Sequence, residues 1–113
     1  MTVQVTKQWQ KVCTKKDLVA HSGVAALVDG KQVALFYLPE NDAIYAIQNY
    51  CPFSDANVIA RGIIGDLKGK LVVASPIYKQ HFCLTTGECL EDNTVKLGVF
   101  DTKIEDDHIH IAL

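Results

Sequence analysis

The side chains of this sequence that could do redox or metal chemistry are its cysteines and histidines. Thiolate sulfur and imidazole nitrogen are the usual protein ligands of zinc and of iron–sulfur clusters. His81 and Cys83 stand two positions apart, as do His108 and His110, so each pair would share one face of a strand. Neither pair has a third ligand close by in the sequence. We therefore interpret His81 as a hydrogen-bonded or exposed strand histidine, Cys83 as a packing residue, and the second pair as a solvated face.

The four cysteines, Cys13, Cys51, Cys83 and Cys89, are predicted to be free thiols. Cys83 and Cys89 flank a predicted turn, and a disulfide between them is geometrically feasible. A reducing compartment disfavours that bond. Cys13 lies in an apolar run and is interpreted as a small buried hydrophobe. A weaker option is a thiol-based sensor that uses Cys51 or Cys89.

The most informative segment spans residues 49–91. It contains the blocks N-Y-C-P-F at 49–53, A-S-P-I-Y at 74–78 and F-C-L-T-T-G-E at 82–88. These blocks resemble the Rieske ferredoxin family, in which C-x-H is followed by a long spacer, then C-x-x-H, then a hairpin of the form F-D-x-x-T-G. The resemblance covers nearly the whole chain. It implies an all-β fold, a Rieske-like β-sandwich or barrel with two loops at the former cluster-binding tip.

In that family two cysteine thiolates hold one iron of a [2Fe–2S] cluster and two histidines hold the other. The resemblance equates the first cysteine, first histidine, second cysteine and second histidine with Cys51, Phe53, Ser75 and Tyr78. Phenylalanine has no ligating atom, and hydroxyl oxygens are poor substitutes for thiolate and imidazole. Because one thiolate cannot hold a cluster, we expect no cofactor and no metal on this chain.

Losing the cluster would leave a hole between the two loops. Empty apolar cavities cost about 24 cal/mol per Å³, so large side chains are expected to fill the space. We predict an apolar tip that serves as a partner-docking surface, with the candidate residues Pro52, Phe53, Pro76, Ile77 and Tyr78. The alternative is a repacked core with no partner.

A cluster-less Rieske-like chain of this length is similar to the small-subunit family of assimilatory NAD(P)H-dependent nitrite reductases. The phrases W-Q-K-V-C at 9–13 and V-A-L-F at 33–36 are consistent with that family. The resemblance implies an accessory role for a chain that is non-catalytic on its own. The implied partner is the nitrite reductase large subunit, which carries FAD, a [4Fe–4S] cluster and sirohaem and reduces nitrite to ammonium.

The alternative function is a stand-alone Rieske-type electron-transfer ferredoxin, or the ferredoxin component of an oxygenase, with atypical ligation. That alternative predicts a coloured, iron-containing protein. Catalysis by the chain alone is disfavoured, because no Ser/His/Asp set or glycine-rich phosphate loop stands in a suitable context. The remaining carboxylates of the segment are interpreted as surface charges and turn residues: Asp55, Asp66, Glu88, Glu91 and Asp92.

Short apolar runs between turns must position these residues, as in small β-sandwiches and barrels. Strands are predicted at residues 9–13, 24–28, 32–38, 43–47, 71–74, 78–84, 103–105 and 108–113. Asp29 and Gly30 predict a type I′ hairpin, because both residues accept positive φ angles. Thr14 is predicted to N-cap a single helical turn. Residues 49–70 are predicted to be irregular.

The composition excludes several classes of partner. The 113 residues are 49% hydrophobic and 21% charged, with a net charge of −2, so no basic surface for nucleic acid is expected. No apolar stretch approaches the roughly 20 residues of a membrane span. Residues 1–6 lack the charged and apolar regions of a secretory signal. We therefore expect one Rieske-like domain over residues 1–113, located in the cytoplasm, with no nucleic-acid or membrane partner.

Overall fold

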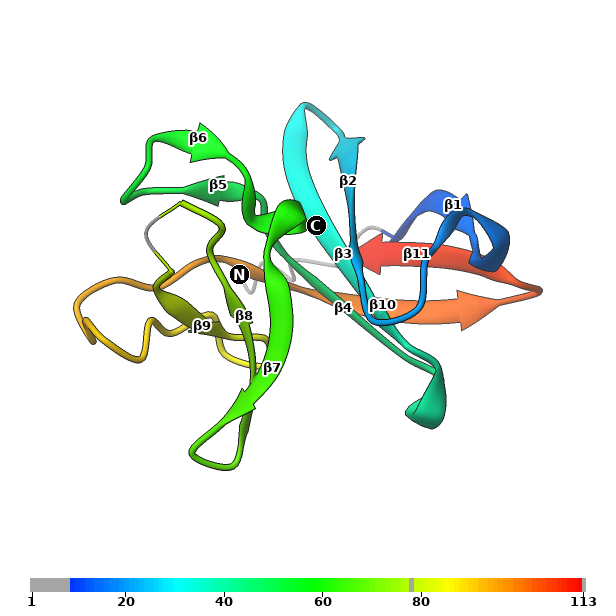
Figure 1. Ribbon diagram of the computed structural model, residues 1–113. Coiled ribbons are helices and arrows are strands. Elements are labelled where there is room, and N and C mark those ends of the chain that lie inside the picture. Colours follow the sequence, from blue (N-terminus) through cyan, green and yellow to red (C-terminus); the bar gives the residue numbers. More distant parts are fainter. Residues whose placement is uncertain (1–8, 78, 113) are drawn as a thin grey trace, which may run out of the picture.

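The computed structural model describes residues 9–77 and 79–112, and these residues form strands and 3-10 turns without an α-helix (Figure 1). The larger sheet has six strands in the order β1-β11-β10-β4-β3-β2, all antiparallel to their neighbours. The edge strands β1 and β2 line a common groove, so the sheet curls toward closure. Its strands are β1 (Trp9–Thr14), β2 (Gly23–Val28), β3 (Lys31–Leu38), β4 (Ala43–Gln48), β10 (Val99–Glu105) and β11 (His108–Ala112).

Two smaller sheets lie on one side of the larger sheet (Figure 1). The first is the hairpin of β5 (Tyr50–Cys51) and β6 (Ala56–Asn57). The second has three antiparallel strands, β7 (Ile63–Leu67), β8 (Lys70–Ala74) and β9 (His81–Cys83). The 3-10 turn η3 (Ile59–Arg61) connects them. The all-β prediction is confirmed. Among the described residues, no helix is long and apolar enough to cross a membrane.

Local turn chemistry behaves as the sequence predicts. Asp29 and Gly30 have φ angles of 51° and 79°, as a type I′ turn requires, and they join β2 to β3. Thr14 caps η1 (Lys15–Asp17) in a capping box, in which the Thr14 amide and hydroxyl both donate to the Asp17 carboxylate. A second 3-10 turn, η2 (Pro39–Asn41), links β3 to β4.

Three predictions of secondary structure were wrong in part. Residues 49–70 are not irregular, because they contain β5, β6, η3 and β7. The glycine at 62 suggested a loop, but a Cβ on Gly62 would lie 2.3 Å from the Ala74 carbonyl oxygen, so glycine is needed for close packing of η3 on β8. β10 begins at Val99 instead of residue 103, since its first residues pair with distant β4. Of the predicted strand 78–84, residue 78 lies outside the described residues, and the strand found is β9, which begins only at His81 because Lys79 has a left-handed φ of 59°.

The core has two clusters that share β3. Phe36 points into the cluster between the larger sheet and the smaller ones, where it is fully buried together with Phe82. Leu35, the preceding residue, points into the cluster inside the curl of the larger sheet, with Ile109 and Ile111. Because successive side chains of a strand point to opposite faces, β3 is buried on both sides.

The last strand follows its predicted alternation. Ile109 and Ile111 are fully buried, whereas His108 and His110 are half-buried on the other face. Residue 113, which was included in this predicted strand, lies outside the described residues.

Candidate functional site

The two loops that carry the family's ligand positions meet at one end of the molecule. Cys51 ends β5, and Ser75 begins the connection from β8 to β9 (Figure 1). Cys51 Sγ lies 3.9 Å from Ser75 Oγ, and both residues are buried, at 0% and 1% exposure. The two positions that the resemblance equates with the family's cysteines therefore lie side by side, although 24 residues separate them in sequence.

Asn49 holds the first loop on the larger sheet. Its backbone N–H donates to the Gln32 carbonyl at 3.1 Å, which attaches it to β3. Its side-chain Oδ1 accepts the Ala60 N–H at 2.8 Å, and its carbonyl accepts the Ile59 N–H at 3.1 Å. Asn49 is only 2% exposed, so it ties β3 to η3 from the interior. Sequence reasoning missed this role; the only signal was a polar residue directly after an apolar strand.

The second loop is closed by a backbone turn. The Ser75 N–H donates to the Gln80 carbonyl at 2.9 Å, and the Lys79 N–H donates to the Ser75 carbonyl at 3.0 Å. Lys79 takes the left-handed conformation that this turn requires. Tyr78, which the resemblance equates with the second histidine of the family's ligand set, lies outside the described residues.

The predicted apolar tip divides into a packed part and an exposed part. Phe53 is half-buried and packs on the core, with its ring tilted against that of Phe82 at a centroid distance of 6.2 Å. Pro52 and Pro76 are exposed, and Ile77 is 49% exposed. Phe53 is therefore held against the core, and Pro52, Pro76 and Ile77 form the exposed part of the tip.

The Cys51 thiol keeps a hydrogen-bonded environment. Burial raises the pKa of this thiol, but hydrogen bonds from Ser54, Phe53 and Ser75 more than offset it, so the pKa of Cys51 lies below its usual range. Hydrogen bonds of this kind to ligand sulfur tune iron–sulfur sites.

The residues present do not fit a [2Fe–2S] cluster. Beside the Cys51 sulfur stands the Ser75 hydroxyl, and Phe53 offers a ring packed into the core in place of an imidazole. Within residues 9–77 and 79–112, no group of three His, Cys, Asp or Glu side chains is arranged to hold a metal ion. Two thiolates and two imidazoles are required.

The other cysteines are free thiols, as predicted. Phe82, not Cys83, pairs with Cys89, so the two sulfurs do not face one another across the hairpin. Burial raises the pKa of Cys83, but hydrogen bonds from Thr85 and Thr86 outweigh this effect and lower the pKa to about 7. Cys13 is half-buried against the second core cluster instead of fully buried, and this partial burial raises its pKa.

His81 is a hydrogen-bonded strand histidine, as predicted. Its Nδ1 lies 2.7 Å from Glu91 Oε2, and its backbone N–H donates to Glu91 Oε1 at 2.7 Å. Burial raises the pKa of Glu91, but these bonds from His81 lower it below its usual range. The prediction that Glu91 is only a surface charge was wrong in part, because its carboxylate fixes the start of β9.

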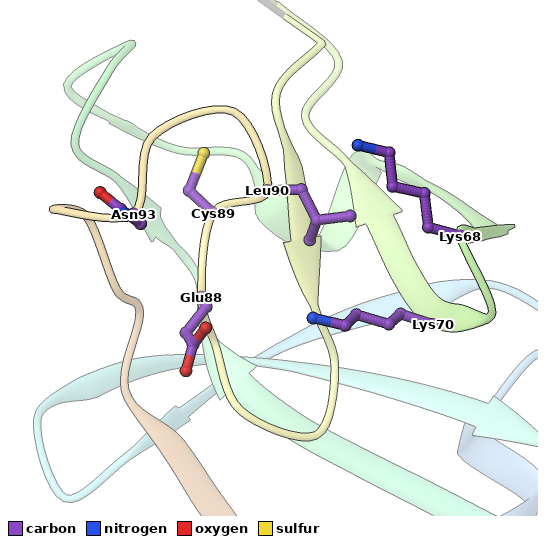
Figure 2. A pocket seen from close by; sticks show the side chains of 6 residues that line it. All are labelled: Lys68, Lys70, Glu88, Cys89, Leu90 and Asn93. Carbon is purple, nitrogen blue, oxygen red and sulfur yellow. The ribbon is translucent and has the colours of Figure 1, made fainter.

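One cavity, of about 250 Å³, lies where the β7–β8 turn faces residues 88–93 (Figure 2). Lys68 and Lys70 extend into it from one wall, and Glu88, Cys89 and Asn93 lie on the other. These are exposed charges around a buried thiol, and no further described group converges on a ligand position. We assign it no function.

A groove of about 380 Å³ lies beside Ser75. It is lined by Arg61, Ile63, Ala74, Ser75, Pro76, Lys79 and His81. This groove was not predicted from the sequence, because it depends on the register between β7 and β8. We call it the β7–β9 groove.

The fold and the site define a Rieske-type scaffold with an altered ligand set. Residues 8–112 match the Rieske-like [2Fe-2S] domain family. The nitrite reductase (NADH) small subunit of Salmonella typhimurium is 41% identical over 99 residues, which cover 88% of this chain and 92% of that protein. The solution structure of the nitrite reductase [NAD(P)H] small subunit from Erwinia carotovora has a TM-score of 0.78 at 40% identity, covering 93% of this chain and 81% of that one. The chain belongs to the Rieske-like [2Fe-2S] domain family.

A third relative differs in its length. The nitrite reductase [NAD(P)H] large subunit of Klebsiella oxytoca is 31% identical over 107 residues, which cover 95% of this chain but 11% of that protein. A segment homologous to this whole domain is therefore part of the large subunit's own chain in that relative.

Proposed function

We propose that this protein is the accessory small subunit of an NAD(P)H-dependent assimilatory nitrite reductase, which converts nitrite to ammonium. It holds no iron–sulfur cluster and docks on the catalytic large subunit. The observation that carries the proposal is the altered ligand set, in which Cys51 lies beside Ser75 while Phe53 packs on the core. A scaffold that keeps its two loops but cannot ligate iron fits a structural or regulatory role better than electron transfer.

The partner follows from the relatives. Small subunits of nitrite reductase align along nearly the whole chain, and the Klebsiella oxytoca large subunit contains a homologous segment. Covalent linkage in one protein supports noncovalent association in another. We place FAD, the [4Fe–4S] cluster and sirohaem on the large subunit, and the complex in the cytoplasm. Residues 1–113 act as one Rieske-like domain without a nucleic-acid or membrane partner.

The docking surface in this proposal is the former cluster tip. Pro52, Pro76 and Ile77 supply exposed apolar area, and Phe53 supports them from the core. Tyr78 is included from the sequence. Apolar side chains clustered at a loop tip are typical of protein interfaces.

Purification of the native complex from its host tests the proposal. We expect this chain to copurify with a much larger flavoprotein, and the isolated chain to be colourless, without stoichiometric iron or sulfide. Ile77→Asp should weaken the complex without unfolding the chain, because Ile77 is half-exposed. A coloured chain with iron and inorganic sulfide would instead establish the ferredoxin function with atypical ligation.

A further inference from the structure

The β7–β9 groove has a floor set by strand register. Ile63 of β7 pairs with Ala74 of β8, and Ala74 pairs with His81 of β9. Directly paired residues point to the same face of a sheet, so these three side chains form one row across the small sheet. At the β7 end of the row, Ile63 is 77% exposed. An apolar side chain this open at the edge of a groove is an anchor for a partner side chain.

Two cations stand at the groove. Arg61 ends η3 and Lys79 lies in the β8–β9 connection, and both are exposed. Neither forms an ion pair with another described residue. The carboxylate that contacts the row, that of Glu91, is already paired with the His81 ring and backbone N–H. In a chain with a net charge of −2, this is a local site of positive charge beside an apolar floor.

The groove also adjoins the proposed docking tip. Ser75 and Pro76 line it, and Ile77, 49% exposed, follows directly. The groove has a volume of about 380 Å³. Removing its apolar side chains from water on binding would favour association.

We propose that the β7–β9 groove receives a segment of the catalytic large subunit in which an apolar side chain stands next to an aspartate or glutamate. The apolar side chain packs on Ile63 and Ala74, and the carboxylate pairs with Arg61 and Lys79. This inference rests on the proposed function, since it names the chemistry of the partner at the same interface.

Binding of purified variants to the holo large subunit, measured by biolayer interferometry, tests the groove. Arg61→Glu, Lys79→Glu and Ile63→Ser are each expected to raise Kd at least about tenfold, since charge reversal or loss of an anchor at a desolvated contact acts mainly on dissociation. The wild-type Kd should rise with salt, and it should rise less in the charge variants.

The chain offers matched controls. Lys68→Glu matches Lys79→Glu, because both lysines are exposed and both have a left-handed backbone conformation, with φ angles of 55° and 59°. Leu27→Ser matches Ile63→Ser, because Leu27 is 68% exposed on β2 and does not line the groove. Both controls should bind as the wild type does. Thermal melting of every variant checks that the fold is kept.

Carbodiimide cross-linking tests the partner chemistry directly. We expect Lys79, and not Lys68, to form an amide bond with an aspartate or glutamate of the large subunit, with loss of water. If all three groove variants bind with the Kd of the wild type, or if the cross-link forms at Lys68 alone, the proposed role of the groove is refuted. The small-subunit function would remain. No binding of the wild type would overturn both. Groove variants that change only self-association would assign the surface to a second copy of this chain.

Discussion

Asn49→Ala is the substitution for which the structure gives the clearest expected result. The Asn49 Oδ1 is the acceptor for the buried Ala60 N–H, and alanine leaves that donor without a partner. A buried unsatisfied donor costs about 1–3 kcal/mol. Because Asn49 is 2% exposed, water reaches the site poorly. We expect the free energy of unfolding to fall by about 2 kcal/mol.

Urea denaturation measures this change. With the slopes usual for small domains, a loss of about 2 kcal/mol lowers the midpoint by about 1 M. The melting temperature should fall by roughly 8 °C. Asn57→Ala is the matched control, since Asn57 is exposed on β6, and it should change stability by less than about 0.5 kcal/mol.

A result for Asn49→Ala indistinguishable from Asn57→Ala would refute the reasoning. It would mean that the bond between Asn49 and Ala60 is replaced at no cost. The position of η3, and with it the position of Arg61, would then need another explanation.

Three further predictions use the same kind of measurement. Gly87→Ala should lower the free energy of unfolding by about 3 kcal/mol in urea denaturation, because φ is +83° and the new Cβ would lie 2.0 Å from the Leu97 oxygen. The control Gly30→Ala, whose Cβ would stand in open space, should lower it by about 1 kcal/mol. Equal losses for the two variants would contradict this reasoning. The pKa of Cys83 is about 7 in the folded protein, below the ordinary value of 9.0 for a cysteine thiol. Between these two values the unfolded chain binds more protons, so the contribution of this thiol to stability should rise from pH 7 to pH 9. Subtracting the profile of Cys83→Ala isolates that contribution, and a flat difference would exclude it. Phe53→Ala should cost about 2 kcal/mol, less than the roughly 3–5 kcal/mol of a fully buried phenylalanine, because Phe53 is half-buried against the core, and an unchanged melting temperature would contradict this packing.

Local chemistry was readable from the sequence. Asp29 and Gly30 specified a hairpin, because few other pairs accept two positive φ angles, and Thr14 with Asp17 specified a capped turn. The β11 alternation followed from period two. Each of these signals lies within a few consecutive residues, where the sequence and the backbone conformation are directly linked.

Features set by long-range pairing were not readable. β7 was predicted as a loop because Gly62 and Gly65 suggest flexibility, and only its pairing with β8 shows otherwise. The β7–β9 groove depends on the same register. The division of the tip also required the structure, since nothing in the block 49–53 indicates that Phe53 turns inward onto Phe82 while Pro52 stays outside.

The shared strand β3 has a consequence for how the molecule comes apart. Its Phe36 belongs to the half that carries the two loops, and its Leu35 belongs to the curled half. Neither half can separate from β3 without exposing its own apolar contacts, so we expect the halves to melt in one step. Hydrogen exchange would then report a single slowest class of amides drawn from both. Partial unfolding that frees one half while the other stays folded is therefore not expected to be an accessible state of this protein.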